Sequence, residues 1–260
     1  MGTRFFPATK TNPKEMFPIV DKPLIQYAAE EAISAGINEL IFIEAPTKRS
    51  IKDHFVKAYE LEDELKKKGK EKELQILKSI IPDNITCTYI PQPEPLGLGH
   101  AVLCAKSVIG DSSFIVLLPD DLIIKKNCSK AMISIHKKYK SSVMASMNVN
   151  KKAVSRWGIY NVKKKINKNN FIIKDVVEKP SIKDAPSNKA VIGRYILPKI
   201  IFKKLLKQKS GKGGEIHITD AIQSLLKNDL KFIGHNFAGK YLDCGTMNGY
   251  INSTLEIAKI

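Results

Sequence analysis

Residues 1–27 read Met1-Gly-Thr-Arg-Phe-Phe-Pro-Ala-Thr-Lys-Thr-Asn-Pro-Lys-Glu-Met-Phe-Pro-Ile-Val-Asp-Lys-Pro-Leu-Ile-Gln-Tyr27, and this stretch is the most informative part of the sequence. The turn-prone Gly2-Thr3-Arg4 and the pair Pro13-Lys14 bracket a positively charged loop that leads into a helix. A loop of this kind favours the binding of a polyphosphate. Such a loop is ordinarily held by a preceding strand, whereas here it starts at Met1.

The residues that follow predict an α/β protein. Apolar residues at helical spacing after Pro23, ended by Gly36, indicate a helix, and residues 40–43 read as a short buried strand before a helix at about 47–59. The unbroken apolar run 114–118 is typical of a strand buried on both faces. This alternation predicts a mostly parallel central sheet flanked by helices.

Two charged stretches are expected at the surface. Residues 60–80 carry dense alternating charge around a narrow leucine stripe, which predicts a solvated helical excursion. Residues 163–170 are rich in Lys and Asn and read as a hairpin loop between two strands.

Length and composition indicate one globular domain over residues 1–260, because 260 residues that are 43% hydrophobic can bury a substantial core. No apolar run approaches the roughly 20 residues that cross a bilayer, and residues 1–20 do not read as a signal peptide. We therefore expect a cytoplasmic protein with no membrane partner. The four cysteines are far apart and indicate neither a zinc site nor a disulfide framework.

The net charge of +17 raises the question of nucleic-acid binding. Only four of the 43 basic residues are arginines, although nucleic-acid surfaces favour the bidentate guanidinium. A generic lysine-rich surface explains the charge better, with some nonspecific polyanion binding at low salt. We expect no specific nucleic-acid partner.

The ordered motifs resemble one known family. Bacterial UTP–glucose-1-phosphate uridylyltransferases carry Gly-x-Gly-Thr-Arg-Phe-Leu-Pro-x-Thr-Lys, then Pro-Lys-Glu-Met-Leu-Pro and Asp-Lys-Pro-Leu-Ile-Gln-Tyr, which the first 27 residues match almost letter for letter. The resemblance continues in order with Pro91-Gln92-Pro93, Leu96-Gly97-Leu98-Gly99-His100, Leu118-Pro119-Asp120-Asp121, Trp157-Gly158, Glu178-Lys179-Pro180, Gly193-Arg194-Tyr195, Ile218-Thr219-Asp220-Ala221 and Leu242-Asp243-Cys244-Gly245. One such motif is weak, but the ordered set covers nearly the whole chain and is highly specific.

The resemblance implies a fold and an activity. The fold is the Rossmann-like α/β fold of the nucleotide-diphospho-sugar transferases. The activity is transfer of UMP from UTP to glucose 1-phosphate, which gives UDP-glucose and pyrophosphate with Mg²⁺ as cofactor. The expected partners are these two small-molecule substrates, and the expected assembly is a homo-oligomer, a dimer or tetramer.

The chemistry of that reaction calls for cations rather than a protein nucleophile. A phosphate oxygen of the sugar phosphate attacks the α-phosphate of the nucleotide, and because this oxygen is already ionised, the protein has to neutralise charge and align the reactants. Arg4 and Lys14, ten residues apart around the loop, are the candidate catalytic residues. The sequence shows no Ser-His-Asp or Cys-His motif.

Acidic residues after the apolar strand 114–118 are the candidate metal ligands. In an open sheet, a strand directs residues at its carboxyl end toward the ligand crevice. A hard divalent cation such as Mg²⁺ takes one or two carboxylates plus phosphate and water oxygens. The resemblance assigns this role to Asp120 and Asp243, whereas Asp121 reads as a structural residue of the turn.

Further residues are candidates for the nucleotide. Gly2 and Thr3 belong to the phosphate loop, and Gln92 can both donate to and accept from the edge of uracil. The resemblance implies this role for Gln92, with help from the backbone of Gly97. His100 opens the next helix and is expected to be structural.

The resemblance also implies a subsite for the sugar phosphate. Glu178 suits the sugar hydroxyls and Lys179 suits the phosphate. Gly158 and Gly193 match positions where the backbone contacts the hexose and a side chain would collide. Trp157 occupies a place that tyrosine often holds in the family.

The sequence departs from the family at its start. Relatives carry an apolar strand and a further Gly before the position of Met1, and the loss of a strand of about 5–6 residues forfeits several kcal/mol or more, comparable to the whole stability of a domain. We therefore expect the natural product to start upstream, with Met1 an internal residue. The domain would then be a truncated one, with the first strand of the sheet missing.

The sequence leaves three other functions open. The first is that of a nucleotidyltransferase with another base or sugar, since base choice depends on few contacts. The second is that of an inactive protein of the same shape that acts by binding, which the missing strand would permit. The third is that of a polyanion-binding protein.

Overall fold

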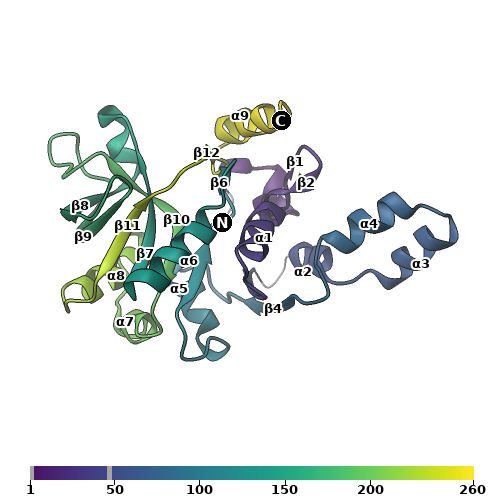
Figure 1. The fold of residues 1–260 in the computed structure, drawn as a ribbon, viewed down its shortest axis with the longest axis horizontal. Coiled ribbons are helices and arrows are strands. Elements are labelled where there is room, and N and C mark those ends of the chain that lie inside the picture. The colour runs from purple at the N-terminus through teal and green to yellow at the C-terminus, as the bar shows by residue number, and fades with distance from the viewer. Residues whose placement is uncertain (1–2, 46–48) are drawn as a thin grey trace.

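Strands and helices alternate along most of the chain in the computed structural model, which describes residues 3–45 and 49–260 (Figure 1). The strands are β1 (Pro18–Ile19), β2 (Lys22–Pro23), β3 (Glu39–Glu44), β4 (Thr86–Pro91), β5 (Phe114–Leu117), β6 (Asp121–Ile124), β7 (Ser142–Asn148), β8 (Gly158–Lys165), β9 (Asn170–Glu178), β10 (Lys189–Leu197), β11 (Phe232–Asn236) and β12 (Lys240–Asp243). The α-helices are α1 (Leu24–Ser34), α2 (Ser50–Phe55), α3 (Tyr59–Lys67), α4 (Glu71–Ser79), α5 (Leu98–Cys104), α6 (Cys128–Tyr139), α7 (Ile201–Lys207), α8 (Ile218–Leu226) and α9 (Met247–Ile257). The 3-10 helices are η1 (Thr3–Phe5), η2 (Ala8–Lys10), η3 (Lys14–Met16), η4 (Ala105–Ser107), η5 (Lys151–Arg156) and η6 (Lys212–Gly214).

The largest sheet has six strands in the order β5-β10-β7-β11-β9-β8. The chain is α/β as expected, but the expectation of a mostly parallel sheet is wrong for these strands, because β7–β11 is the one parallel pairing among them in the described residues. The apolar run 114–118 that suggested a parallel strand contains β5, which pairs antiparallel with β10. Helices cover both faces of this sheet, so that an antiparallel strand such as β10 is also apolar on both sides.

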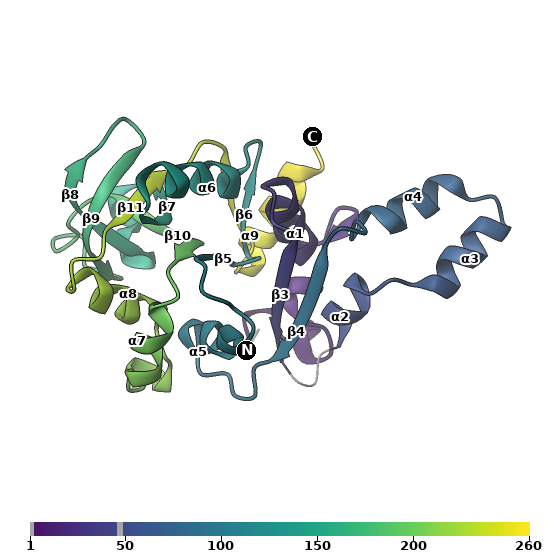
Figure 2. The same cartoon turned by 60° about the horizontal axis from the view of Figure 1, so that its bottom comes forward.

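Helices pack on both faces of the six-stranded sheet. Residues of α6 join Val143, Ile192 and Ile233 in one apolar cluster. Residues of α5, α7 and α8 join Met144, Tyr160 and others in a second cluster. Figure 2 shows α6 on one side of these strands and α7 and α8 on the other.

The predicted alternation of strands and helices after residue 24 is present. Its strands β3 and β4 form a two-stranded parallel sheet of their own. α1 ends before Gly36, whose φ of +90° is a backbone conformation that favours glycine. β3 and β4 pair in parallel from Glu39–Thr86 to Glu44–Pro91. The expected helix at 47–59 is shorter, since α2 covers Ser50–Phe55, and the first expected residues lie outside the described part.

β3 and β5 each pair with a neighbour along one edge, and no described strand pairs with their other edges. Leu117 of β5 packs in the same apolar cluster as Leu40 and Phe42 of β3, so the two strands share one core. The strand that the resemblance led us to expect before Met1 lies outside residues 1–260 and stays a prediction.

The charged stretch at 60–80 forms a pair of helices that projects from the rest of the chain (Figures 1 and 2). α3 and α4 are joined through Gly69, which has a φ of +65°. Tyr59 and Ile76 are largely exposed on this hairpin. The predicted solvated helical excursion is therefore confirmed, with a break at Gly69.

The predicted hairpin is confirmed, but its loop is shorter than the expected 163–170, because β8 extends to Lys165 and β9 begins at Asn170. β8 and β9 pair antiparallel from Gly158–Glu178 to Lys165–Phe171. Ile166 N–H donates to the carbonyl of Asn170 at 2.9 Å across the turn.

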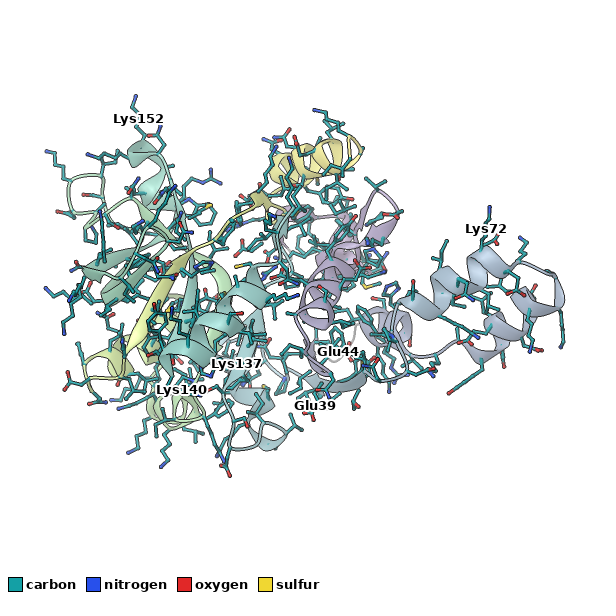
Figure 3. The ribbon with its side chains drawn as sticks, in the orientation of Figure 1. Glu39, Glu44, Lys72, Lys137, Lys140 and Lys152 are labelled. Carbon is teal, nitrogen blue, oxygen red and sulfur yellow. The ribbon has the colours of Figure 1, made fainter. Side chains whose placement is uncertain are left out.

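Lysines are spread over the whole surface rather than gathered on one face. Figure 3 shows Lys72 on the projecting hairpin, Lys140 at the end of α6 and Lys152 on η5, which lie on separate parts of the molecule. This distribution favours the interpretation of the net charge as a generic solvated surface. Within the described residues, no helix combines the length and the apolar character that a membrane span requires.

Candidate active site

Asp120 and Asp243 come together because two short strands pair. β6 and β12 run antiparallel with Asp243 opposite Asp121, and Cys244 N–H donates to the carbonyl of Asp120 at 2.8 Å. The two carboxylates converge over Gly245. A Cβ atom at Gly245 would lie 3.1 Å from Asp120 Oδ2 and 3.3 Å from Asp243 Oδ1, so this glycine keeps the space between them open.

The N-terminal loop brings its cations to the same place. Lys14 Nζ donates to Asp120 Oδ2 at 2.5 Å, and Arg4 Nη1 makes a long contact of 3.5 Å with the carbonyl of Gly245. Burial lowers the pKa of Lys14, but the attraction and hydrogen bond of Asp120 outweigh it, so the pKa is raised above its ordinary value. Lys14 therefore carries its positive charge throughout the neutral range. The structure brings together Arg4 and Lys14, the candidate catalytic residues, with Asp120 and Asp243, the candidate metal ligands.

Two carboxylates are few ligands for a metal ion. Among the residues that the structure describes, no group of three or more His, Cys, Asp or Glu side chains is placed to hold one. Two carboxylates that lie close together suit Mg²⁺, which completes its shell with phosphate oxygens and water. The arrangement therefore fits a cation that arrives together with a polyphosphate.

Asp121 has the structural role that the sequence suggested. Its Oδ2 accepts from the N–H of Gly193 at 2.7 Å, and its Oδ1 accepts from the hydroxyl of Tyr241 at 2.6 Å. Burial raises the pKa of the Asp121 carboxyl, although the hydrogen bond from Tyr241 opposes that shift. The side chain ties β6 to β10 and β12, and it fixes the turn that presents Asp120.

A buried ion pair supports this turn, and the sequence motifs did not predict it. Arg194 is fully buried, and its Nε and Nη2 donate to Glu31 Oε2 at 3.1 and 2.9 Å. Arg194 Nη1 donates to the carbonyl of Leu118 at 2.8 Å, two residues before Asp120. Glu31 Oε1 accepts from both N–H and Oγ of Ser129. The network links α1, β10 and α6 to the turn that carries Asp120.

The candidate nucleotide residues Gln92 and Gly97 lie side by side. Gln92 Nε2 donates to the carbonyl of Gly97 at 3.2 Å, and it also lies 3.2 Å from His100 Nδ1. Gly97 has a φ of +89°, and a Cβ atom there would lie 3.0 Å from Cβ of Glu215. The backbone conformation therefore requires glycine at position 97. His100 contacts Gln92, which fits the structural role expected of His100.

The other two nucleotide candidates stand at the start of the chain. Gly2 lies outside the described residues. Thr3 begins the 3-10 helix η1, and its backbone alone is described. Their assignment to the nucleotide stays a prediction.

Three of the four sugar-phosphate candidates are neighbours. Gly158 pairs with Glu178 across β8 and β9, and Lys179 N–H donates to the carbonyl of Trp157 at 3.0 Å. A Cβ atom at Gly158 would lie 3.1 Å from Glu178 Oε2. The side chains of Glu178 and Lys179 are more than half exposed and form an ion pair at 3.4 Å, so both are accessible to a ligand.

Gly193 has a packing role that the sequence did not reveal. A Cβ atom there would lie 2.5 Å from Asp121 Oδ2 and 2.6 Å from Leu118. Its N–H is donated to Asp121, and its carbonyl accepts from Leu118 N–H and from Arg194 Nη1. These contacts explain the glycine through the core, and its contact with a hexose stays a prediction.

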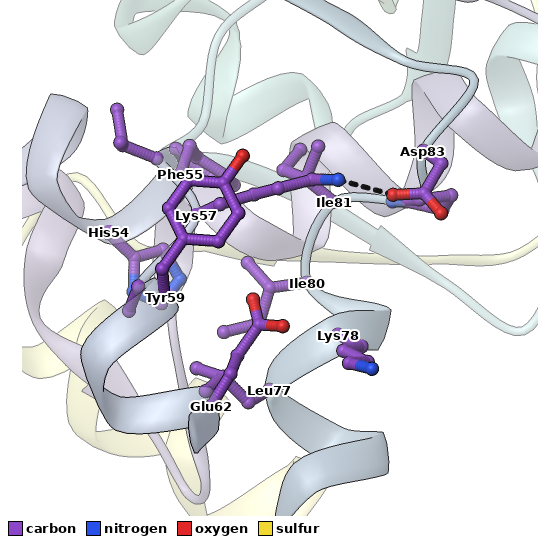
Figure 4. Close-up of a pocket in the computed structure, with 13 residues that line it drawn as sticks. His54, Phe55, Lys57, Tyr59, Glu62, Leu77, Lys78, Ile80, Ile81 and Asp83 are labelled. Carbon is purple, nitrogen blue, oxygen red and sulfur yellow. Dashed lines mark hydrogen bonds and ion pairs between the residues drawn. The ribbon is translucent and has the colours of Figure 1, made fainter. Parts of the chain in front are cut away.

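Of two hollows in the structure, one is lined in part by candidate site residues and the other is not. One, of about 870 Å³, is lined by Arg156, Trp157, Tyr241 and Asp243 together with α9, and of the two paired carboxylates it includes that of Asp243. The other, of about 440 Å³, lies between α2 and the α3–α4 hairpin, where Lys57 pairs with Asp83 (Figure 4). The second hollow contains none of the candidate site residues.

Comparison with known proteins decides the family. The profile of the family described as "Nucleotidyl transferase" matches residues 1–260. A UTP–glucose-1-phosphate uridylyltransferase of Pseudomonas aeruginosa is 43% identical over 256 residues, which are 97% of this chain and 91% of the relative. The chain belongs to the nucleotidyl transferase family. Its resemblance to the uridylyltransferases of that family is thereby confirmed.

Solved structures extend the comparison to the fold. The crystal structure of an apo UDP-glucose pyrophosphorylase superposes with a TM-score of 0.92 at 43% identity, over 99% of this chain and 94% of the other. A UDP-glucose pyrophosphorylase in complex with UDP-glucose gives 0.89 at 42% identity, over 99% and 95%. This nucleotidyl transferase therefore shares its α/β fold with these enzymes.

Proposed function

We propose that the chain transfers UMP from UTP to glucose 1-phosphate and releases pyrophosphate. The observation that carries the proposal is the convergence of Arg4 and Lys14 on the paired carboxylates of Asp120 and Asp243. The chain has this arrangement within a family whose similar members are named for that reaction. We further propose that residues 1–260 act as one domain.

The reaction balances without a protein nucleophile. An ionised phosphate oxygen of glucose 1-phosphate forms a bond to the α-phosphorus of UTP, and the bond from that phosphorus to the bridging α–β oxygen breaks. Pyrophosphate leaves with the electron pair. Because both reactants are anions, Arg4 and Lys14 lower the barrier by neutralising the charge that builds up on the leaving side.

We assign Asp120 and Asp243 to a Mg²⁺ ion. Asp120 Oδ2 and Asp243 Oδ1 lie 3.1 and 3.3 Å from the position that a Cβ atom of residue 245 would take, and this closeness supports the assignment. When bound there, the ion would supply positive charge to the triphosphate and help to hold its α-phosphate in line. In this proposal Lys14, which donates to Asp120, also contacts the phosphates.

The remaining candidates recognise the two substrates in this proposal. Gln92 and Gly97 contact the uracil, and Gly2 and Thr3 contact the phosphates of UTP. Glu178 accepts hydrogen bonds from the hexose hydroxyls, Lys179 pairs with the sugar phosphate, and the backbone at Gly158 and Gly193 borders the ring.

A pyrophosphate-release assay across nucleotides and sugar phosphates tests the proposal. We expect the rate with UTP and glucose 1-phosphate to exceed that with CTP or ATP by roughly a hundredfold, because a site that hydrogen-bonds the edge of uracil leaves polar groups unpaired with cytosine or adenine. Reactions without sugar phosphate serve as the control. Faster release with a different nucleotide or hexose phosphate would assign the chain to that substrate pair.

Proteins that act only by binding would behave differently. An inactive protein of this shape would be stabilised against heat by UTP but would release no pyrophosphate. A polyanion-binding protein would retain RNA at physiological salt.

We also propose that the protein is a cytoplasmic homo-oligomer, a dimer or tetramer. The molar mass from light scattering after gel filtration tests the assembly. A mass equal to that of one chain would refute it.

A further inference from the structure

Arg156 contacts one of the two carboxylates assigned to the cation. It is the last residue of η5, and its Nη2 donates to Asp243 Oδ2 at 3.2 Å. Its guanidinium carbon lies 5.8 Å from the ring centre of Trp157. The side chain is 62% exposed, so it can leave Asp243 without disturbing the core.

Each of the paired carboxylates therefore forms an ion pair with a basic side chain of the protein. Lys14 pairs with Asp120, and Arg156 pairs with Asp243. The other oxygen of Asp243, Oδ1, accepts from the N–H of Gly245 at 3.0 Å. A divalent cation at Asp243 would sit close to the guanidinium and be repelled by it, so that Arg156 and the cation compete for this carboxylate.

Arg156 is also next to the residues assigned to the sugar phosphate. Trp157, which follows it, accepts a hydrogen bond from the N–H of Lys179. Gly158, one residue further, pairs with Glu178. A phosphate bound beside Lys179 would thus lie near a guanidinium that donates to one carboxylate oxygen, Oδ2 of Asp243. Guanidinium groups bind phosphate dianions by two parallel hydrogen bonds, which makes the phosphate the stronger partner.

We propose that Arg156 is a positioning residue that couples binding of the sugar phosphate to binding of the cation at Asp243. Without sugar phosphate, Arg156 neutralises Asp243 and weakens cation binding. When the sugar phosphate binds, its dianion accepts hydrogen bonds from the guanidinium of Arg156, which then no longer contacts Asp243 Oδ2. The inference rests on the proposed assignment of Asp120 and Asp243 to a cation. Because such coupling is reciprocal, the cation also strengthens binding of the sugar phosphate.

The test measures cation affinity without turnover. Mn²⁺ is titrated into protein that holds an equimolar amount of α,β-methylene-UTP, which cannot release pyrophosphate, with and without glucose 1-phosphate. Free Mn²⁺ is followed by electron paramagnetic resonance. In the unaltered protein, we expect glucose 1-phosphate to raise Mn²⁺ affinity on the order of threefold to fivefold, the range expected for an exposed ion pair.

Variants of Arg156 separate coupling from net charge. Arg156→Ala should bind Mn²⁺ more tightly than the unaltered protein when glucose 1-phosphate is absent, and should lose the response to it. Arg156→Lys should keep part of the response. Lys152→Ala is the matched control, because Lys152 lies on the same 3-10 helix, carries the same charge and points away from the molecule in Figure 3.

Two results would overturn the inference at different levels. If Arg156→Ala responds to glucose 1-phosphate as the unaltered protein does, Arg156 has no coupling role even though the cation site stands. If Asp243→Ala binds Mn²⁺ as tightly as the unaltered protein, the cation assignment itself is wrong, and the inference fails with it.

Discussion

Asp243→Ala is expected to lower turnover by on the order of a hundredfold to a thousandfold, because it removes one of the two carboxylates placed to hold the cation that positions the triphosphate. The fold should survive. Asp243 lies at the end of β12 and its side chain contacts the backbone of Gly245 and the exposed Arg156, so its loss leaves no buried charge unpaired. The rate of pyrophosphate release at saturating Mg²⁺ measures the effect.

A second variant makes this result specific to the site. Asp63→Ala removes a carboxylate from the projecting hairpin, where Asp63 pairs with the exposed Lys67. It should leave turnover unchanged. Asp243→Ala protein that unfolds at the normal temperature and still turns over at a near-normal rate would refute the assignment of Asp243.

Glu31→Ala is expected to destabilise the protein by about 3–5 kcal/mol, because it leaves the guanidinium of Arg194 buried without a counter-charge. Arg194 is 0% exposed, so water cannot replace the carboxylate unless the core opens. A loss of this size is a large part of the roughly 5–15 kcal/mol by which domains are stable. Urea unfolding followed by circular dichroism gives the change.

A double variant distinguishes an unpaired charge from lost packing. Glu31→Leu with Arg194→Met removes both charges together and should cost less than the sum of the single changes. The double variant should also turn over slowly even where it is folded, because Arg194 no longer donates to the carbonyl of Leu118 near Asp120. Additive free energies in this cycle would show that the pair acts as two independent residues.

Residues of the site were predictable where the chemistry is local to a motif. Arg4 and Lys14 stand in one loop with turn-forming neighbours, and the structure places both at the carboxylates that the motifs also marked. Glu31 was not predictable in this way. A glutamate within a helix usually faces solvent, and the partner that explains its burial is 163 residues away in the chain.

The sheet was likewise predictable only in the features that depend on neighbouring residues. The helix after Pro23 and the hairpin between β8 and β9 were predicted, because both depend on neighbours in sequence. The direction of β10 was not. A strand covered by helices on both faces is apolar throughout, whether its neighbours are parallel or antiparallel, so its sequence carries no sign of their direction.

The sequence by itself determined the helices, the cationic loop, the acidic residues at strand ends and the family to which these motifs belong. Only the tertiary structure decided that β12 pairs with β6, that Gly245 keeps open the space between Asp120 and Asp243, and that Arg156 occupies one of these carboxylates. The physical reason is one of distance along the chain. Helices and turns form from contacts between near neighbours, whereas the position of each charge depends on which distant segments are buried together.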